Sequence, residues 1–134
     1  MKIDGGCHCG RITYEAEVDA AQVEVCHCTD CQTLSGSAFR TVVPALEGTF
    51  KLLTGTPKTY IKTAENGSER AQVFCPECGT PIYSAPAGGE STFVGIRAGT
   101  ARQRSRLRPR RQYWCRSAQD WVQDLSSLTK VATQ

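Results

Sequence analysis

Seven of the eight cysteines in this 134-residue chain fall into three short groups, and their spacing limits the fold more than any other feature. Cys7 and Cys9 form a C-x-C pair, and Cys75 and Cys78 form a distant C-x-x-C pair. In an extended segment residues i and i+2 point to one face, so Cys7 and Cys9 can bind the same metal ion. A C-x-x-C pair followed by Gly79 is typical of a tight metal-binding turn. Together the two pairs predict a tetrahedral four-cysteine zinc site that ties the N-terminal segment to the middle of the chain.

The third group, Cys26, Cys28 and Cys31, offers three ligands instead of four. Three protein ligands and an open fourth position are the arrangement of a catalytic zinc, whereas structural sites are closed. The remaining cysteine, Cys115, stands alone in the segment QYWCRS. Two interpretations stay open here: Cys115 is a free thiol, or it closes the site and makes it a second structural zinc.

An open, thiolate-rich zinc favours sulfur chemistry. Three thiolates and Zn²⁺ sum to a charge of about −1, which weakens the ion as a Lewis acid but suits an incoming soft ligand. A substrate thiol bound there would be a thiolate at neutral pH, although the pKa of a free thiol is about 8.5. It could then add to a small electrophilic carbon. We therefore expect a labile, catalytic zinc at Cys26, Cys28 and Cys31.

His8 and His27 each stand between two cysteines. The alternation that brings the cysteines to one face turns the histidines to the other. We expect hydrogen-bonding roles for them, with proton transfer as the alternative, and no ligation of the same metal.

Length and composition predict one globular domain over residues 1–134, because hydrophobic residues make up 40% and charged residues 22% of the chain. The start, MKIDGGCHCG, lacks the apolar region of a secretory signal, and no stretch approaches the roughly 18 apolar residues of a membrane span. We expect a cytoplasmic protein without a membrane partner. Eight cysteines in that compartment favour metal binding over disulfides, and a disulfide framework in a secreted protein is the alternative.

Hydrophobic periodicity predicts short β-strands. In RITYEAEV the apolar residues alternate with polar ones, and similar segments are QVEVCHC, AFRTVV, TFKLL, KTYIKT, RAQVF, the residues after the C-x-x-C turn, and STFVGIRAG. Asn66-Gly67 predicts a hairpin turn. A short helix is expected from an N-cap at Asp30 to Gly36, and Ser117-x-x-Asp120 predicts helical turns near the C-terminus. The expected fold is mainly β: a small, zinc-pinned, antiparallel sheet domain with one or two short helices.

Five arginines stand at every second position between residues 102 and 111, in RQRSRLRPRR. If this stretch is extended, they share one face. The arginines then form a solvated surface, attract an anionic substrate such as glutathione through its carboxylates, or dock an acidic partner. Aromatic residues are not interleaved with them, and we do not expect a nucleic acid partner.

The pattern GGCHCG…CHCTDCQTLSGSAF…FCPECGTPIY resembles the family of glutathione-dependent formaldehyde-activating enzymes, whose wider superfamily includes centromere protein V. The likeness covers nearly the whole chain and implies an all-β, β-tent-like fold with two zinc ions. It assigns Cys7, Cys9, Cys75 and Cys78 to the structural zinc, and Cys26, Cys28 and Cys31 to the catalytic one.

The resemblance also implies a reaction: glutathione is joined to formaldehyde to give S-hydroxymethylglutathione, which is a carbon–sulfur lyase reaction run in reverse and serves formaldehyde detoxification. The expected partners are thus a small thiol and a small electrophile. Ser35, Gly36, Ser37 and Phe39 follow the three clustered cysteines and are candidates for lining the substrate pocket, with a structural turn as the alternative. The alternative function is a non-catalytic module in which both zinc ions are structural and residues 102–111 dock an acidic partner.

Overall fold

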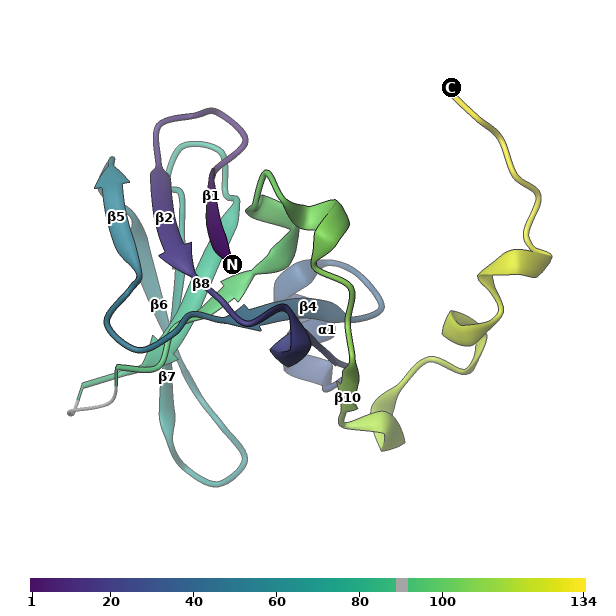
Figure 1. Ribbon diagram of the computed structural model, residues 1–134. Coiled ribbons are helices and arrows are strands. Elements are labelled where there is room, and N and C mark those ends of the chain that lie inside the picture. The colour runs from purple at the N-terminus through teal and green to yellow at the C-terminus, as the bar shows by residue number, and fades with distance from the viewer. Residues whose placement is uncertain (89–91) are drawn as a thin grey trace.

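The computed structural model describes residues 1–88 and 92–134, and these form ten short β-strands, one α-helix and several 3₁₀ turns (Figure 1). The strands and the helix are β1 (Lys2–Gly6), β2 (Thr13–Glu17), β3 (Glu24–Cys26), α1 (Thr29–Ser35), β4 (Arg40–Pro44), β5 (Lys51–Thr54), β6 (Lys58–Thr63), β7 (Glu69–Phe74), β8 (Pro81–Pro86), β9 (Gly95–Arg97) and β10 (Arg111–Tyr113).

The strands make two sheets, with the orders β1-β2-β5 and β10-β3-β4-β9-β8-β7-β6. All neighbouring pairs are antiparallel except β10 and β3, which run parallel. The expected mainly β fold with a short helix is confirmed. The parallel pair is a difference from the prediction, because it joins segments more than 80 residues apart that carry no local pairing signal.

Side chains from both sheets meet in one hydrophobic core. Along β2 the predicted alternation is confirmed, since Tyr14 and Ala16 are buried while the residues between them face outward. Val43 on β4 pairs with Ile96 on β9, and both are fully buried. These two residues therefore mark the core-facing side of the larger sheet.

The opposite face of the larger sheet carries polar residues that later form the site. Cys26 on β3 is paired with Arg40 on β4, and two residues further along β4, Val42 is paired with Arg97 on β9. Paired residues share a face, and so do residues two apart on one strand. Cys26, Arg40 and Arg97 consequently lie on the same side of the sheet.

The same register brings β7 into this face. Gln72 on β7 is paired with Ser84 on β8, which in turn is paired with Gly95 on β9, two residues before Arg97. The sheet therefore aligns a row of residues across five neighbouring strands, in the order β3, β4, β9, β8 and β7.

The predicted Asn66-Gly67 turn is confirmed. It precedes β7 and connects β6 to β7 as an antiparallel hairpin, with Gly67 at φ +85°.

The helix α1 begins two residues earlier than expected. Its N-cap is Cys28, whose sulfur accepts a hydrogen bond from the backbone N–H of Cys31, and Asp30 lies in the first helical turn. The prediction of Asp30 as N-cap is wrong, because the metal-ligand spacing already fixes the chain at Cys28. The predicted end is confirmed: Gly36 closes the helix in the left-handed conformation.

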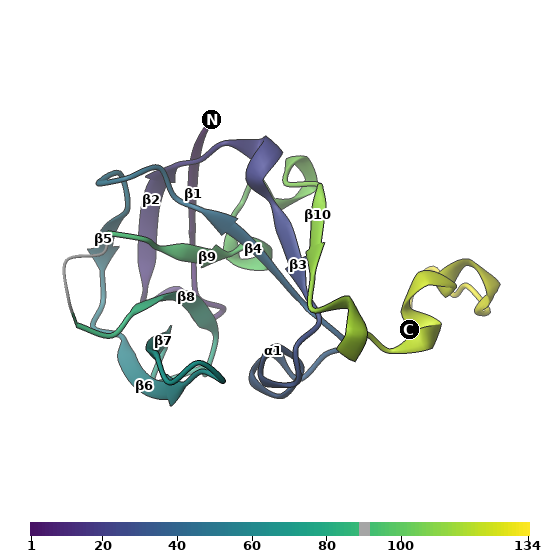
Figure 2. The same cartoon turned by 90° about the horizontal axis from the view of Figure 1, so that it is seen from below.

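The predicted capping pattern Ser117-x-x-Asp120 is wrong. Ser117 ends one 3₁₀ turn, Cys115–Ser117, and the next turn, Asp120–Gln123, begins after Gln119 without a side-chain cap. From residue 118 onward the chain projects away from the domain (Figures 1 and 2), and Trp121 is largely exposed there. The segment forms two short 3₁₀ turns, Asp120–Gln123 and Leu125–Ser127, because a helix of this length is only marginally stable in water.

The arginine stretch does not form the extended face on which its docking roles depended. A 3₁₀ turn, Arg104–Arg106, interrupts it, and Leu107 behind the turn is buried. Arg102 forms an ion pair with Asp4 on β1, so this side chain supports the sheet packing. Because of this turn, the five guanidinium groups do not form the single row that an extended strand would give.

Among the described residues, no helix has the length and apolar character needed to cross a bilayer. The single-domain organisation and the cytoplasmic location stay predictions.

Candidate metal centres and a polar cavity

The first cysteine cluster joins the loop after β1 to the turn after β7. The sulfur atoms of Cys7, Cys9, Cys75 and Cys78 all lie within 4.8 Å of one another. The Sγ–Sγ distances are 3.5 Å for Cys7–Cys9 and 3.8 Å for Cys9–Cys75. A tetrahedron with Zn–S bonds of about 2.3 Å has edges of roughly 3.8 Å, so the cluster fits one zinc ion.

Backbone donors support this first cluster. The N–H of Ile12 donates to Cys7 Sγ at 3.2 Å, and the N–H of Gly79 donates to the carbonyl of Cys75 at 2.9 Å. Gly79 has a φ of +75°, the left-handed conformation that tight metal-binding turns require. The Thr80 hydroxyl lies 3.1 Å from Cys78 Sγ and is the largest cause that lowers the pKa of Cys78, to about 5. The Cys78 sulfur is thus favoured as thiolate, the form that binds metal.

The second cluster lies where β3 passes into α1. Cys26, Cys28 and Cys31 are all half-buried, and their sulfur atoms lie within 4.8 Å of one another. Cys31 lowers the pKa of Cys26 to about 5 through a side-chain hydrogen bond, and the pKa of Cys31 is raised in turn by the same contact. Within this pair the Cys26 sulfur is therefore favoured as thiolate, the form that binds metal. These three residues could hold a metal ion.

Cys115 does not join this cluster. Its thiol is exposed and donates to the carbonyl of Gln112 at 3.8 Å. In the part of the chain that the structure describes, neither a histidine nor a carboxylate completes the set. The interpretation in which Cys115 supplies a fourth ligand thus has no support from the geometry.

The two histidines lie outside both clusters. His8 is exposed, and its backbone N–H donates to Thr80 Oγ1. His27 is buried: its Nε2 lies 2.8 Å from Gln112 Oε1 on β10, and its ring packs edge-on against Phe39. Because His27 connects β3 to β10, its contacts are those of a residue that holds the parallel strand pair together.

Gln32 fixes α1 against the C-terminal part of the domain. Its side-chain amide nitrogen donates to the carbonyl of His27 at 2.8 Å and to that of Ser117 at 2.9 Å. The amide oxygen accepts a hydrogen bond from Gln119 at 2.9 Å. Figure 2 shows α1 below the ends of β3 and β4, close to the segment that follows β10. The helix that contains Cys31 and is capped by Cys28 is therefore held from both sides.

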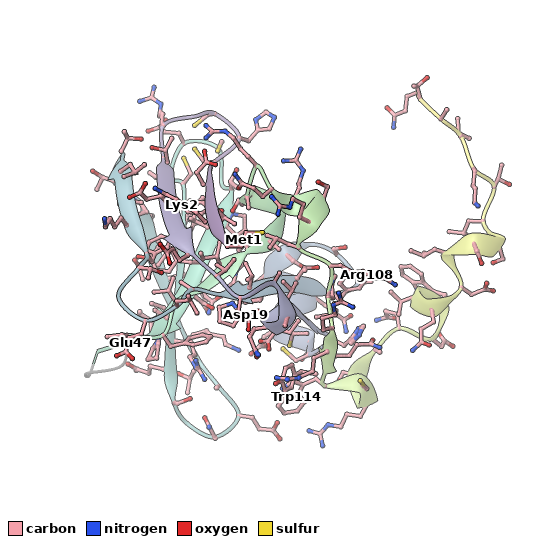
Figure 3. All side chains as sticks on the ribbon, in the orientation of Figure 1. Met1, Lys2, Asp19, Glu47, Arg108 and Trp114 are labelled. Carbon is pink, nitrogen blue, oxygen red and sulfur yellow. The ribbon has the colours of Figure 1, made fainter. Side chains whose placement is uncertain are left out.

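A cavity of about 940 Å³ opens beside the second cluster. Its floor is the polar face of the larger sheet, and its walls are the start of α1, the β6–β7 hairpin and residues 114–117. Lys62 and Asp30 form an ion pair of 2.8 Å across one wall. On another wall the Arg116 guanidinium lies 4.8 Å from the centre of the Trp114 ring. Figure 3 shows Trp114 at the junction of the domain and the C-terminal extension. The cavity is large enough for a small peptide-like substrate.

The floor of the cavity contains two arginines that the sequence analysis missed. Arg40 and Arg97 are each 7% exposed, and both donate to the side-chain oxygen of Gln72. Burial, together with the smaller effect of the Arg40 charge, lowers the pKa of Arg97 to about 9. A charged residue at an otherwise apolar alternation in AFRTVV and GIRAG was the available signal.

The predicted pocket residues lie at the far end of α1. Ser35 is the last residue of the helix, and its hydroxyl donates to the carbonyls of Gln32 and Phe39. Gly36 provides the left-handed cap, and Ser37 donates its N–H to the Gln32 carbonyl. These four positions, 35–37 and 39, are not among the described residues that line the 940 Å³ cavity. Their substrate contacts stay a prediction, while their visible contacts close the helix.

Comparison with known proteins gives a family. The family model described as "Glutathione-dependent formaldehyde-activating enzyme" matches residues 2–117. The chain belongs to this family. The match includes both cysteine clusters and ends where the C-terminal extension begins, so the resemblance noted in the sequence is confirmed.

One curated protein and one solved structure extend the comparison. An uncharacterized lyase of Schizosaccharomyces pombe is 25% identical over 96 residues, which are 67% of this chain and 62% of that protein. The chain thus spans less than two thirds of the relative's length. A crystal structure of a Rhodobacter sphaeroides protein has a TM-score of 0.61 at 17% identity and covers 81% of this chain and 98% of its own. That likeness shows the fold alone.

Proposed function

We propose that the protein is a carbon–sulfur lyase-type enzyme that adds a thiol to formaldehyde or a related small carbonyl compound. Glutathione is the thiol and formaldehyde the carbonyl compound that the family description names. The observation that carries the proposal is the convergence of three cysteine sulfurs at the wall of a large cavity. Cys115, which could have completed the set, lies apart from them.

The two clusters take different roles in this proposal. Cys7, Cys9, Cys75 and Cys78 hold a structural zinc, and Cys26, Cys28 and Cys31 hold a labile, catalytic one. When bound at the second cluster, zinc supplies a position at which an incoming thiol loses its proton at neutral pH. A fourth ligand at the first cluster leaves no comparable position there.

The residues around the second cluster prepare the site for this chemistry. Cys28 caps α1 and Gln32 anchors it, so the three sulfurs keep their mutual arrangement before substrate enters. The cavity brings the carbonyl compound against the thiol. A carbon–sulfur bond forms between the thiol sulfur and the carbonyl carbon. The π bond of the C=O group breaks, which leaves a C–O single bond, and the proton released by the thiol is transferred to that oxygen. The addition is balanced without a redox partner.

Product formation tests the reaction. The zinc-loaded protein is mixed with ¹³C-formaldehyde and glutathione, and the S-hydroxymethyl signal is followed by ¹³C NMR against the uncatalysed rate. We expect an accelerated approach to equilibrium. A fully zinc-loaded protein that gives no acceleration with glutathione or with other small thiols would contradict the proposed reaction.

A chelator titration tests the two roles of zinc. We expect one equivalent to leave first, with loss of activity and an unchanged circular dichroism spectrum, and the second to leave with the fold. Release of both ions in one step together with unfolding would favour the alternative in which both sites are structural.

A further inference from the structure

Arg40, Gln72 and Arg97 form a compact group on the floor of the cavity. Arg40 Nη1 donates to Gln72 Oε1 at 3.1 Å, and Arg97 Nη2 donates to the same oxygen at 2.8 Å. All three residues are less than 10% exposed. One neutral amide oxygen thus holds two guanidinium groups close to each other within the protein.

This arrangement leaves two buried positive charges without a carboxylate. Within residues 1–88 and 92–134, the ion pairs involve other side chains, and neither Arg40 nor Arg97 takes part in one. Each guanidinium has five N–H donors, and among the described residues one donor of each forms a side-chain hydrogen bond, in both cases to Gln72. The Nε of Arg97 is buried without a partner. Buried charges of one sign are costly unless an opposite charge meets them.

The metal centre accounts for only part of this charge. Cys26 is paired with Arg40 in the β3–β4 register, so the arginines face the second cluster. Three thiolates and one divalent cation sum to −1, whereas the two arginines carry +2. The other charged residues that line the cavity do not change this balance, because Lys62, Arg70 and Arg116 carry +3 and Glu24, Asp30 and Glu65 carry −3. One positive charge in the cavity therefore remains for an anion.

Both arginines line spaces that a ligand could enter. Arg40, Gln72 and Arg97 line the 940 Å³ cavity and also a second, smaller cavity of about 400 Å³ near Leu34 and Tyr83. The three side chains therefore line both the 940 Å³ cavity and the 400 Å³ cavity. A planar guanidinium presents paired donors that match the two oxygens of a carboxylate.

We propose that Arg40 and Arg97 bind one carboxylate group of a substrate, beside the three cysteines of the second cluster. This inference rests on the proposed thiol addition and deepens it. Formaldehyde has no charge, so the carboxylate belongs either to the thiol, as in glutathione, or to a carbonyl substrate that bears an acid group, as in a 2-oxo acid. Arg97 is the more informative residue, because it lies on β9, one strand further from the cysteines than β4, which carries Arg40.

Binding of thiol-free probes tests the site independently of turnover. S-methylglutathione and glyoxylate are titrated separately into the zinc-loaded protein and into its Arg97→Gln variant, by calorimetry or NMR. We expect at least one probe to bind, and its affinity to fall roughly ten-fold or more in Arg97→Gln. Arg70→Gln is the matched control, because Arg70 lines the same cavity and its loss removes the same charge; there the affinity should change less than about three-fold.

Zinc content is measured for every variant, so that loss of the metal is not mistaken for loss of the anion site. Should Arg97→Gln fail to fold, Arg97→Lys keeps the charge and removes the paired donors, and an intermediate loss of affinity is expected. Probe binding that is unchanged in the arginine variants, or no binding of either probe to the zinc-loaded protein, would overturn the inference. In that case the arginines serve only to balance the thiolates.

Steady-state kinetics then identify the source of the carboxylate. Three substrate pairs are compared: glutathione with formaldehyde, cysteamine with formaldehyde, and cysteamine with glyoxylate. If the thiol carries the carboxylate, Arg97→Gln raises the KM for glutathione and leaves that for cysteamine unchanged. If the carbonyl compound carries it, the KM for glyoxylate rises and that for formaldehyde does not. Equal effects on all pairs contradict carboxylate binding, whereas absence of turnover in the parent protein contradicts only the thiol addition and leaves the probe titration decisive.

Discussion

The two cysteine clusters use the same side chain but connect the chain in different ways. The first joins residues such as Cys9 and Cys75, which are 66 positions apart, and holds the β1–β2 loop to the turn between β7 and β8. The second lies within six consecutive residues, 26–31. Closing a long loop removes much more freedom from the unfolded chain than closing a short one. A metal ion at the first cluster therefore contributes to the fold, while one at the second contributes mainly to the local site.

The number of ligands and their place relative to the large cavity also differ. At the first cluster Cys7 and Cys75 are buried and Cys9 and Cys78 are exposed, whereas all three cysteines of the second are half-buried and line the large cavity. Four ligands in one cluster, and three ligands at a cavity wall in the other, are what the roles of a structural and a reactive metal require. The comparison can be tested by removing ligands from each cluster in turn.

The largest effect is expected for Cys78→Ser. Loss of one ligand from the four-cysteine cluster weakens metal binding that is coupled to folding, so the free energy of unfolding should fall by more than about 3 kcal/mol. Urea denaturation followed by circular dichroism measures this, with zinc content determined in parallel. A stable, fully folded Cys78→Ser protein with one zinc ion would remove the distinction between the clusters.

Cys28→Ser should abolish thiol addition while the fold is retained. Serine is a good N-cap, so the hydroxyl can replace the sulfur that caps α1, although it is a poor ligand for a soft site. We expect activity to fall about 100-fold or more, with a change in the free energy of unfolding below about 1 kcal/mol. Activity and unfolding are measured on the same preparation, and retained activity would show that the second cluster is not the reactive one.

Gln32→Ala should have an intermediate effect confined to the second cluster. Two hydrogen bonds from its amide nitrogen are lost, which costs about 1–2 kcal/mol and loosens α1. Competition with a coloured chelator should show weaker metal binding at the second cluster and an unchanged first one. Gln119→Ala, which removes only the bond to the Gln32 oxygen, is the milder control. Equal weakening of both clusters would mean that they are not independent.

The smallest effect is expected for Cys115→Ser. The thiol is exposed and belongs to neither cluster, so the zinc content should stay the same and stability should change by less than about 0.5 kcal/mol. Mass spectrometry under native conditions measures the zinc content directly. Loss of one zinc ion in this variant would place Cys115 at the metal and close the site proposed for the substrate.

Features that depend on a few neighbouring residues were predictable. The alternation in RITYEAEV, the Asn66-Gly67 hairpin and the helix end at Gly36 are all found in the structure. The cysteine groups were also predictable, because ligand spacing in C-x-C and C-x-x-C segments is itself local. The helix start was misplaced by the same kind of reasoning: a cysteine caps α1, and propensity favoured Asp30.

The sequence by itself determined which cysteines group together and that the chain is mainly β, since both follow from spacing and periodicity along short segments. Only the tertiary structure decided that Cys115 stays apart from the second cluster and that Arg40, Gln72 and Arg97 meet on the floor of one cavity. Those contacts depend on the register between strands far apart in the chain. Register is fixed by how both sheets bury their apolar faces together, and single segments do not contain that information.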